Sequence, residues 1–423
     1  MTNMKIVQIN TVFRNGGSTG RIAYDLMLAQ KSAGIEAYAA YGYDTRAEHT
    51  SNTFCMQGFL RRKFNILRTR LFDNHGFYNE FETDKLLRWL DIIHPDIIHL
   101  HNIHNHYIHV GKLFEYIKKN DISVVWTLHD CWSFTGHCAH FDYANCEKWK
   151  TGCNKCPCLK EYPPTWFFDR SLKNYEDKKN AFCGVKNMTI ITPSRWLADF
   201  IPESFLKNYP VKVINNGVDI QKFIPNANIP KTIEEQTNGK KVILAMAAGL
   251  GERKGGGYIK QLPPLLNEDE ILLLVGGGAR KLASLFPNKC IGIEYTNNVN
   301  ELAGYYSLAD VFINPTLEDN FPTTNIEAMS CGTPVVTFRT GGSIESVLDD
   351  EIIYNDGDIE QTKVGMVVPK GDISSMLCAI RKIEAKGKLF FADSCRNKVI
   401  EKYEKNKQYQ EYIKLYQNIF ALR

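Results

Sequence analysis

The sequence predicts an α/β protein with two doubly wound domains, each a parallel sheet covered by helices on both faces. Its 423 residues are too many for one ordinary hydrophobic core and suit two domains of roughly 200 residues each. Apolar, strand-like runs alternate with helical patterns along the chain. A polar stretch at 221–240, which contains Pro225 and Pro230, interrupts this alternation and is a plausible interdomain linker.

The first half opens with the apolar run Lys5–Asn10, which we expect to be a buried parallel strand. A glycine-rich turn at Asn15–Gly20 follows, and a helix then extends through Gln30 because its apolar residues recur at helical spacing. The same reasoning predicts further strands and helices at Glu36–Tyr41, Thr83–Ile93, Asp96–His101, His109–Asn120, Ser123–Leu128 and Met188–Pro193.

The second half repeats the alternation after the linker and ends in a charged helical tail, Phe391–Arg423. We therefore predict domains at 1–222 and 223–395, with the final helix at 396–423. Strands of the second sheet are expected at Val242–Ala247, Ile271–Val275, Val311–Asn314 and Pro334–Phe338.

Charge and composition exclude several classes of protein. The net charge is +4 and no long basic block is interleaved with aromatic residues, so we expect no nucleic-acid partner. Residues Met1–Phe13 lack the features of a secretory signal, and no long apolar run predicts a membrane span. Twelve cysteines without a secretory signal indicate a reducing compartment, so a cytoplasmic location is expected.

The cysteines gather in a segment at about 131–160 that is rich in Gly, Asn and charged residues and is predicted to be a loop insertion. Cys153 and Cys156 have the spacing of a zinc-binding pair, and Cys138 and Cys146 supply two further thiols. Four thiolates would fill the coordination sphere of zinc, so the metal would be structural. Free thiols, a partial site and disulfides remain the alternatives.

The most informative motif is a pair of carboxylates, Asp319 and Glu327, separated by seven residues. A turn-like segment between them leads into an apparent helix, which a Gly-Thr-Pro break ends. Free N–H groups at a helix start attract an anion such as a pyrophosphate. A carboxylate on either side could then accept hydrogen bonds from hydroxyls, and a nucleotide sugar has this layout of sugar, diphosphate and ribose.

These residues resemble the acidic-x7-acidic signature of glycosyltransferase family 4, whose members are retaining enzymes of the GT-B type. The resemblance implies two Rossmann-like domains facing across a cleft, with the last helix crossing back to the first domain. Within the family, the chain resembles bacterial capsule and lipopolysaccharide glycosyltransferases. Further matches occur in the family's order along nearly the whole chain: Gly16-Gly17, His129-Asp130, Thr192-Pro-Ser194, Asn216–Asp219, Arg253-Lys254 and the acidic pair.

The donor-binding residues predicted on this basis lie mostly in the second half. Arg253 and Lys254 stand in a glycine-rich loop after a strand and suit a diphosphate. Backbone N–H groups around Phe321, Pro322, Thr323 and Thr324 would join them, and Glu327 would hold the ribose. Weaker glycine signals after other strands add Gly276, Gly16 and Gly17.

The predicted catalytic residues are His129, Asp319 and Glu327. Asp319 would orient the donor sugar. His129 follows an apolar strand, and the resemblance implies a hydrogen bond from it to a donor-sugar hydroxyl. His99 and His101 should share one strand face, and we favour structural and cleft-lining roles for them over a metal site. The predicted chemistry needs no metal, so a structural zinc ion is the one cofactor that enters the prediction.

The segment Phe59–Phe72 combines five cations with apolar residues near helical spacing. Such a helix can lie on an anionic membrane surface, and a solvated or cleft-facing helix is an equal alternative. Because many members of the family act on lipid-linked acceptors, peripheral contact with the inner face of the plasma membrane enters the prediction.

The sequence therefore predicts a retaining glycosyltransferase that moves a sugar from a nucleoside diphosphate sugar to a glycan or lipid-linked glycan acceptor in bacterial surface polysaccharide biosynthesis. Two alternatives remain. One is a nucleotide-sugar epimerase or hydrolase on the same fold, which differs in product stereochemistry and acceptor requirement. The other is a non-enzymatic, zinc-stapled carbohydrate-binding protein, which would neither transfer nor hydrolyse a donor.

Overall fold

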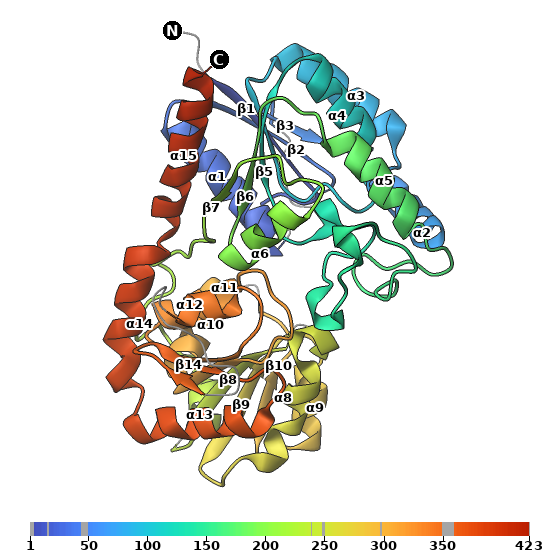
Figure 1. Cartoon of the computed structure of the whole chain (residues 1–423). Helices are drawn as coiled ribbons and strands as arrows, with labels where there is room; N and C mark the ends of the chain where they lie inside the picture. Colours follow the sequence, from blue (N-terminus) through green and yellow to red (C-terminus); the bar gives the residue numbers. More distant parts are fainter. Residues whose placement is uncertain are drawn as a thin grey trace. The chain divides into compact units, whose positions relative to one another are not determined.

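Two seven-stranded sheets organise the described residues of a computed structural model, which are 4–14, 17–43, 50–237, 239–247, 250–296, 298–348 and 359–422 (Figure 1). The chain divides into two units. Unit 1 comprises Met1–Asn215 together with Tyr409–Arg423, and unit 2 comprises Asn216–Gln408. The predicted α/β class with two doubly wound sheets is confirmed.

The sheet of unit 1 is parallel throughout and has the strand order β3-β2-β1-β4-β5-β6-β7. The order reverses between β1 and β4, so this is the switch point of a doubly wound sheet. Its strands and helices are β1 (Lys5–Asn10), α1 (Gly17–Ser32), β2 (Glu36–Tyr41), β3 (Thr53–Cys55), α2 (Phe59–Phe72), α3 (Glu80–Ile93), β4 (Ile97–Leu100), α4 (Val110–Lys119), β5 (Ser123–Thr127), α5 (Ser171–Phe182), β6 (Met188–Thr192), α6 (Arg195–Phe200) and β7 (Val211–Val213).

The sheet of unit 2 repeats this plan in the order β10-β9-β8-β11-β12-β14-β13, with β13 alone antiparallel to its neighbour. Its switch point lies between β8 and β11. The strands and helices are α7 (Lys231–Thr237), β8 (Lys241–Met246), α8 (Gly256–Gln261), β9 (Glu270–Val275), α9 (Ala279–Leu285), β10 (Cys290–Ile293), α10 (Val299–Leu308), β11 (Val311–Asn314), α11 (Thr323–Ser330), β12 (Val335–Phe338), α12 (Ser343–Val347), β13 (Glu360–Gln361), β14 (Gly365–Val368), α13 (Ile373–Lys386) and α14 (Leu389–Lys402).

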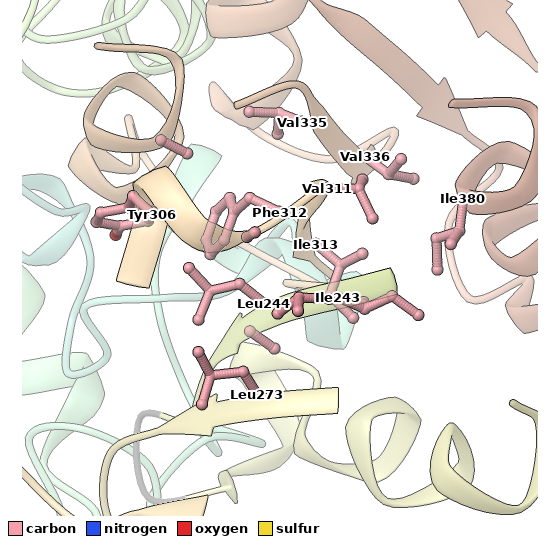
Figure 2. Close-up of a cluster of buried hydrophobic side chains, with 14 of the residues drawn as sticks. Ile243, Leu244, Leu273, Tyr306, Val311, Phe312, Ile313, Val335, Val336 and Ile380 are labelled. Atoms are coloured by element: carbon pink, nitrogen blue, oxygen red, sulfur yellow. The ribbon is translucent and has the colours of Figure 1, made fainter. Parts of the chain in front are cut away.

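The central strands of unit 2 are apolar on both faces, as parallel strands covered by helices require. Figure 2 shows their side chains between Tyr306 of α10 and Ile380 of α13. Phe312 of β11 packs edge-on against Tyr306, with 5.5 Å between the ring centroids. Burial of this cluster stabilises the sheet of unit 2, and the candidate site lies at one edge of that sheet.

Unit 1 buries two apolar layers, one on each face of its sheet. On one face, Leu113 and Phe114 of α4 and Phe182 of α5 pack with Trp126 of β5. On the other, Leu26 of α1 lies in a smaller cluster whose remaining helical members come from the end of the chain: Tyr409, Tyr412, Ile413 and Tyr416.

The charged tail forms two helices rather than the single one expected from the sequence. After α14 the backbone at Glu404 bridges Val218, and α15 (Lys405–Ala421) then begins. The Val218 N–H donates to the Tyr403 carbonyl at 2.9 Å, and the Lys405 N–H donates to the Val218 carbonyl at 3.1 Å. These strand-like bonds replace helical ones, which explains the break.

The segment 131–160 contains three short 3₁₀ turns and no longer helix or strand among its residues, as a loop insertion should. Its interior is nevertheless packed, because Trp149 is buried against Phe134 and Phe141. In the part of the chain that the structure describes, no helix has both the length and the apolar character needed to cross a bilayer.

Replacing Tyr416 tests the contribution of α15 to unit 1. Tyr416→Ala removes a fully buried ring and the hydrogen bond of its hydroxyl to His99 Nδ1 at 2.6 Å, so unfolding should cost about 3–5 kcal/mol less. Tyr416→Phe, the matched control, should lose about 1 kcal/mol. All six tryptophans lie in unit 1, so urea unfolding followed by tryptophan fluorescence reports on this unit. An unchanged midpoint in Tyr416→Ala would show that α15 does not stabilise it.

Candidate functional site

The candidate site of unit 2 is built from two loops at the switch point of its sheet. One loop follows β8 and carries Arg253 and Lys254, and the other follows β11 and carries Asp319. Because β8 and β11 are adjacent parallel strands, both loops leave the same edge of the sheet. The residues that the sequence separates by 65 positions therefore meet.

Lys254 and Asp319 form an ion pair, in which the ammonium donates to Oδ2 of the carboxylate. The side chains are 31% and 17% exposed, so the pair is partly open to solvent. The structure thus brings together the predicted diphosphate cation and the predicted sugar-orienting carboxylate. A positive and a negative group side by side can contact a phosphate and an adjacent hydroxyl of one ligand.

Arg253 makes contacts that the sequence did not predict. Its guanidinium donates from Nη1 to the Glu318 carbonyl at 2.8 Å, and its own carbonyl accepts the Leu317 N–H at 2.8 Å. Arg253 therefore ties the loop after β8 to the backbone immediately before Asp319. Its predicted contact with a diphosphate stays a prediction.

Gly255 permits this close approach of the two loops. Its φ is +77°, and a Cβ at this position would lie 1.9 Å from the Pro315 carbonyl oxygen. Any other residue would force the loops apart. This glycine directly after two cations is a sequence signal from which the loop contact could have been inferred.

The helix α11 begins directly after the carboxylate loop. Pro322 is its N-cap residue, and no side chain caps the first turn, so the N–H groups at Thr323 and Thr324 start the helix. Phe321 is buried, its ring centroid lies 5.5 Å from that of Tyr403, and its carbonyl accepts a hydrogen bond from the Asn216 amide at 3.2 Å. The predicted anion site thus has a firmly held backbone.

A network of buried hydrogen bonds connects α11 to the elements packed against it. The Asn325 amide nitrogen donates to Ser346 Oγ at 2.9 Å and to Ser343 Oγ at 3.2 Å, and its oxygen accepts from Asn314 at 2.8 Å. All the bonds join α11 to neighbouring elements of unit 2. Sequence reasoning missed Asn325 because a single Asn inside a predicted helix carries no signal of a buried polar network.

Glu327 lies in the second turn of α11 and is 9% exposed. Its Oε2 accepts a hydrogen bond from the Tyr306 hydroxyl at 3.1 Å. Burial, and then the nearby Glu327 charge, raise the pKa of Tyr306, so the phenol stays a donor. Tyr306 therefore fixes the carboxylate that we predicted to hold a ribose.

Gly276 follows β9 with a φ of +128°, and a Cβ there would approach the Ala247 backbone to 3.2 Å. It thus allows the loops after β8 and β9 to pack closely. In unit 1, Gly17 opens α1 with a φ of +85°, which favours glycine although the space around it is open. Gly16 lies outside the described residues.

A chain of hydrogen bonds orients His129 in unit 1. Gln8 donates to Gln30 Oε1 at 3.1 Å, which leaves Gln8 Oε1 to accept from His101 Nε2 at 3.0 Å. His101 Nδ1 is then an acceptor, and it receives His129 Nε2–H at 3.1 Å. Neutral His129 therefore carries its proton on Nε2 and keeps Nδ1 as an acceptor.

Both histidines expected on one strand face are found there. The rings of His99 and His101 stack with 4.2 Å between their centroids. Burial lowers the pKa of His99 to about 3, with a contribution from His129. Burial likewise lowers the pKa of His129 to about 4, and Asp130 opposes this. His99 and His101 hydrogen-bond to protein groups, and the structural and cleft-lining roles that we favoured for them stay a prediction.

Asp130 is held by His104, whose Nε2 lies 2.9 Å from its Oδ2, while the Trp132 N–H donates to Oδ1 at 2.9 Å. Burial opposes ionisation of Asp130, but His104, His140 and the Trp132 N–H together outweigh burial, and the pKa of Asp130 falls to about 2. A cavity of about 10 Å³ beside these residues and His129 has room for roughly one water molecule.

The structure divides the predicted zinc ligands into two groups. The Cys138 and Cys156 thiols hydrogen-bond to each other and to Cys158, which the prediction omitted. Cys153 instead accepts the Gly136 N–H at 3.1 Å and lies near Cys146. Among the described residues, no group of three or more His, Cys, Asp or Glu side chains is arranged to hold a metal ion. This geometry does not fit the predicted quartet, and zinc binding stays a prediction.

The buried histidines predict how stability depends on pH. Their pKa values in the folded protein lie below the value of about 6.5 for an unfolded chain, so the unfolded state binds more protons as pH falls. The histidines contribute their full stabilisation above pH 6.5. This stabilisation should be lost as pH falls from about 6.5 toward the folded pKa values, about 4 for His129 and about 3 for His99, by up to ~1.4 kcal/mol per pH unit for each histidine.

Tryptophan-detected urea unfolding at several pH values measures this loss. His101→Gln should give a shallower dependence than the parent protein. His94→Gln, a control at an exposed position, should not. Equal slopes for all three proteins would show that the histidine chain does not set the pH dependence.

Comparison with known proteins follows the same division of the chain. Residues 19–222 match the model of Glycosyltransferase Family 4, and residues 240–385 match that of Glycosyl transferases group 1. The chain is 27% identical over 362 residues to a protein of Escherichia coli named as a colanic acid biosynthesis glycosyl transferase, WcaC, covering 81% of this chain and 85% of that one. It is 24% identical to an Escherichia coli UDP-Gal:α-D-GlcNAc-diphosphoundecaprenol α-1,3-galactosyltransferase, over 51% and 56% of the two chains.

Solved structures agree on the fold. Sucrose-phosphate synthase of Thermosynechococcus elongatus superposes with a TM-score of 0.69 at 17% identity, covering 100% of both chains. Anabaena HepE in complex with UDP gives 0.64 at 15% identity, covering 98% of this chain and 100% of that one. The chain is therefore a glycosyltransferase with the GT-B fold, and it carries a Family 4 domain at 19–222 and a group 1 domain at 240–385.

Proposed function

We propose that this glycosyltransferase moves a sugar, with retention of configuration, from a nucleoside diphosphate sugar to a glycan or lipid-linked glycan acceptor in bacterial surface polysaccharide biosynthesis. The observation that carries the proposal is the Lys254–Asp319 pair beside the start of α11. The names of the Escherichia coli relatives, which mention colanic acid and a diphosphoundecaprenol acceptor, support the acceptor class.

The donor diphosphate would lie at the first turn of α11. The N–H groups and the positive dipole end of the helix favour an anion there, and Lys254 adds a full positive charge. As the bond to the sugar breaks, negative charge grows on the departing diphosphate. These groups would stabilise that charge, so the proposed step would need no metal.

The two carboxylates would divide the recognition of the remaining donor. Glu327, fixed by Tyr306, would accept hydrogen bonds from the ribose hydroxyls. Asp319 would accept one from a hydroxyl of the transferred sugar, next to the phosphate bound by Lys254. His129 would meet a sugar hydroxyl as an acceptor at Nδ1, because its Nε2–H is used by His101.

Retention would follow front-face attack by the acceptor, as the resemblance to the family implies. The anomeric configuration of the product, read by NMR, tests this directly. We further propose that the enzyme works at the cytoplasmic face of the plasma membrane, where a lipid-linked acceptor would be found.

Removing Lys254 or Arg253 should weaken the binding of a nucleoside diphosphate. Lys254→Ala and Arg253→Ala should each cost about 1–3 kcal/mol, the range for a charged hydrogen bond. Arg253→Ala should also lower the melting temperature of unit 2, because Arg253 holds the Glu318 backbone. Calorimetry with UDP, GDP and ADP measures the affinity, and Lys260→Ala, at an exposed position on α8, is the control. Unchanged affinity in both variants would remove this loop from the site.

Replacing the two carboxylates should separate their roles. Glu327→Gln should weaken binding of the bare nucleoside diphosphate, because its proposed partner is the ribose. Asp319→Asn should spare that binding and lower turnover of the full nucleotide sugar. Calorimetry and a transfer assay measure the two effects, with the exposed Glu235→Gln as control. Equal loss of nucleoside diphosphate affinity in both variants would contradict this division.

A further inference from the structure

The helix α2 carries an exposed apolar stripe. Leu60, Phe64 and Leu67 are 80%, 59% and 47% exposed, and their spacing places them on one face of the helix. Single exposed apolar side chains are common on protein surfaces, but a contiguous row marks an interaction site.

The opposite face of α2, which is buried, is polar. Asn65 and Thr69 are 2% and 0% exposed. The Asn65 amide donates to Asn79 Oδ1 at 3.4 Å, and the Thr69 hydroxyl donates to the Asn65 carbonyl at 2.9 Å. A helix that only covers a core has the reverse arrangement. The apolar face of α2 is therefore not explained by the packing of unit 1.

A second exposed apolar segment is fixed to the end of this helix. The Trp166 N–H and the Thr165 hydroxyl donate to the Arg70 carbonyl at 2.7 and 3.0 Å. The rings of Phe72 and Phe168 stack with 5.8 Å between centroids. We call the combined surface the α2 patch, and it consists of Leu60, Phe64, Leu67, Phe72, Trp166, Phe167 and Phe168.

The α2 patch is set among positive charges. The sequence of α2 contains five cations and no acidic residue. Arg61 is paired with Glu82, but Arg62, Arg68 and Arg70 lie over the rings of Tyr43, Tyr78 and Trp166, which leave their charge in place.

Two acidic residues that adjoin the α2 patch in sequence, Asp73 and Asp169, are hydrogen-bonded to other groups. Buried Asp73 accepts from His137 and from the Arg170 N–H, and Asp169 accepts the Cys156 and Ser171 N–H groups. The surface is thus both apolar and cationic.

We propose that the α2 patch docks on the surface of a bilayer that contains anionic phospholipid. Its leucine and phenylalanine side chains would enter the boundary between headgroups and acyl chains, Trp166 would lie at the headgroup level, and the arginines would contact phosphates. A second copy of this chain fits less well, because a twofold contact would place two sets of five cations against each other.

Membrane docking deepens the proposed function. It rests on that function for the reason why the enzyme would need to lie on a membrane. A lipid-linked acceptor lies in the plane of the membrane, so an enzyme held there by unit 1 meets it at high local concentration. The docking surface itself depends only on the contacts of α2 and the 165–168 segment. It can therefore be tested without any transfer reaction.

Co-sedimentation of the full chain with vesicles tests the proposal. The protein should bind vesicles of phosphatidylcholine with phosphatidylglycerol, release at raised salt, and bind weakly to phosphatidylcholine alone. Phe64→Gln should lower the partition coefficient roughly tenfold, and Arg68→Gln roughly fivefold. Phe390→Gln is the matched control in unit 2, because Phe390 is 62% exposed and Phe64 is 59% exposed.

Three outcomes would overturn the proposal: equal binding to neutral and anionic vesicles, equal effects of Phe64→Gln and Phe390→Gln, or a dimer that Phe64→Gln dissociates in light scattering. Transfer to a soluble acceptor separates this inference from the proposed function. Phe64→Gln should retain that transfer while losing vesicle binding. Vesicle binding in a protein that transfers no sugar would sustain the α2 patch and refute the proposed function.

Discussion

The candidate donor site depends on the close contact of two backbones at one sheet edge. Gly255 passes so near the Pro315 carbonyl that no side chain fits between them, and Arg253 bonds to the backbone at Leu317 and Glu318, just after this contact. Lys254 is thereby carried to Asp319. The parallel pairing of β8 and β11 makes the contact possible, since both loops must leave the sheet at the same edge.

In unit 1, buried hydrogen bonds likewise position a candidate site residue. Hydrogen bonds run from Gln30 through Gln8 and His101 to His129, and they fix one tautomer of His129. A residue proposed to touch substrate is therefore oriented by groups deep in the sheet. The buried face of α2 is also polar and hydrogen-bonded. Its apolar side chains therefore lie on the exposed face.

Much of the fold could be predicted because long parallel strands are apolar on both faces. β1 and β2 have the predicted bounds, and β11 and most of β12 were located in the same way. The strands that were missed have two to four residues each, and runs this short show no clear period: β3, β7, β10, β13 and β14. Motif order singled out Lys254, Asp319 and Glu327 as predicted site residues, but it carried no information on the partners that the structure gives them.

The sequence by itself determined the two doubly wound sheets, the family and the residues that flank each switch point. Only the tertiary structure decided that Arg253 holds a backbone carbonyl, that Cys158 joins Cys138 and Cys156, and that α2 turns its apolar face outward. The reason is physical. Periodicity and loop position are local properties of a chain, whereas hydrogen-bond partners and the burial of a given face depend on segments that meet only after folding.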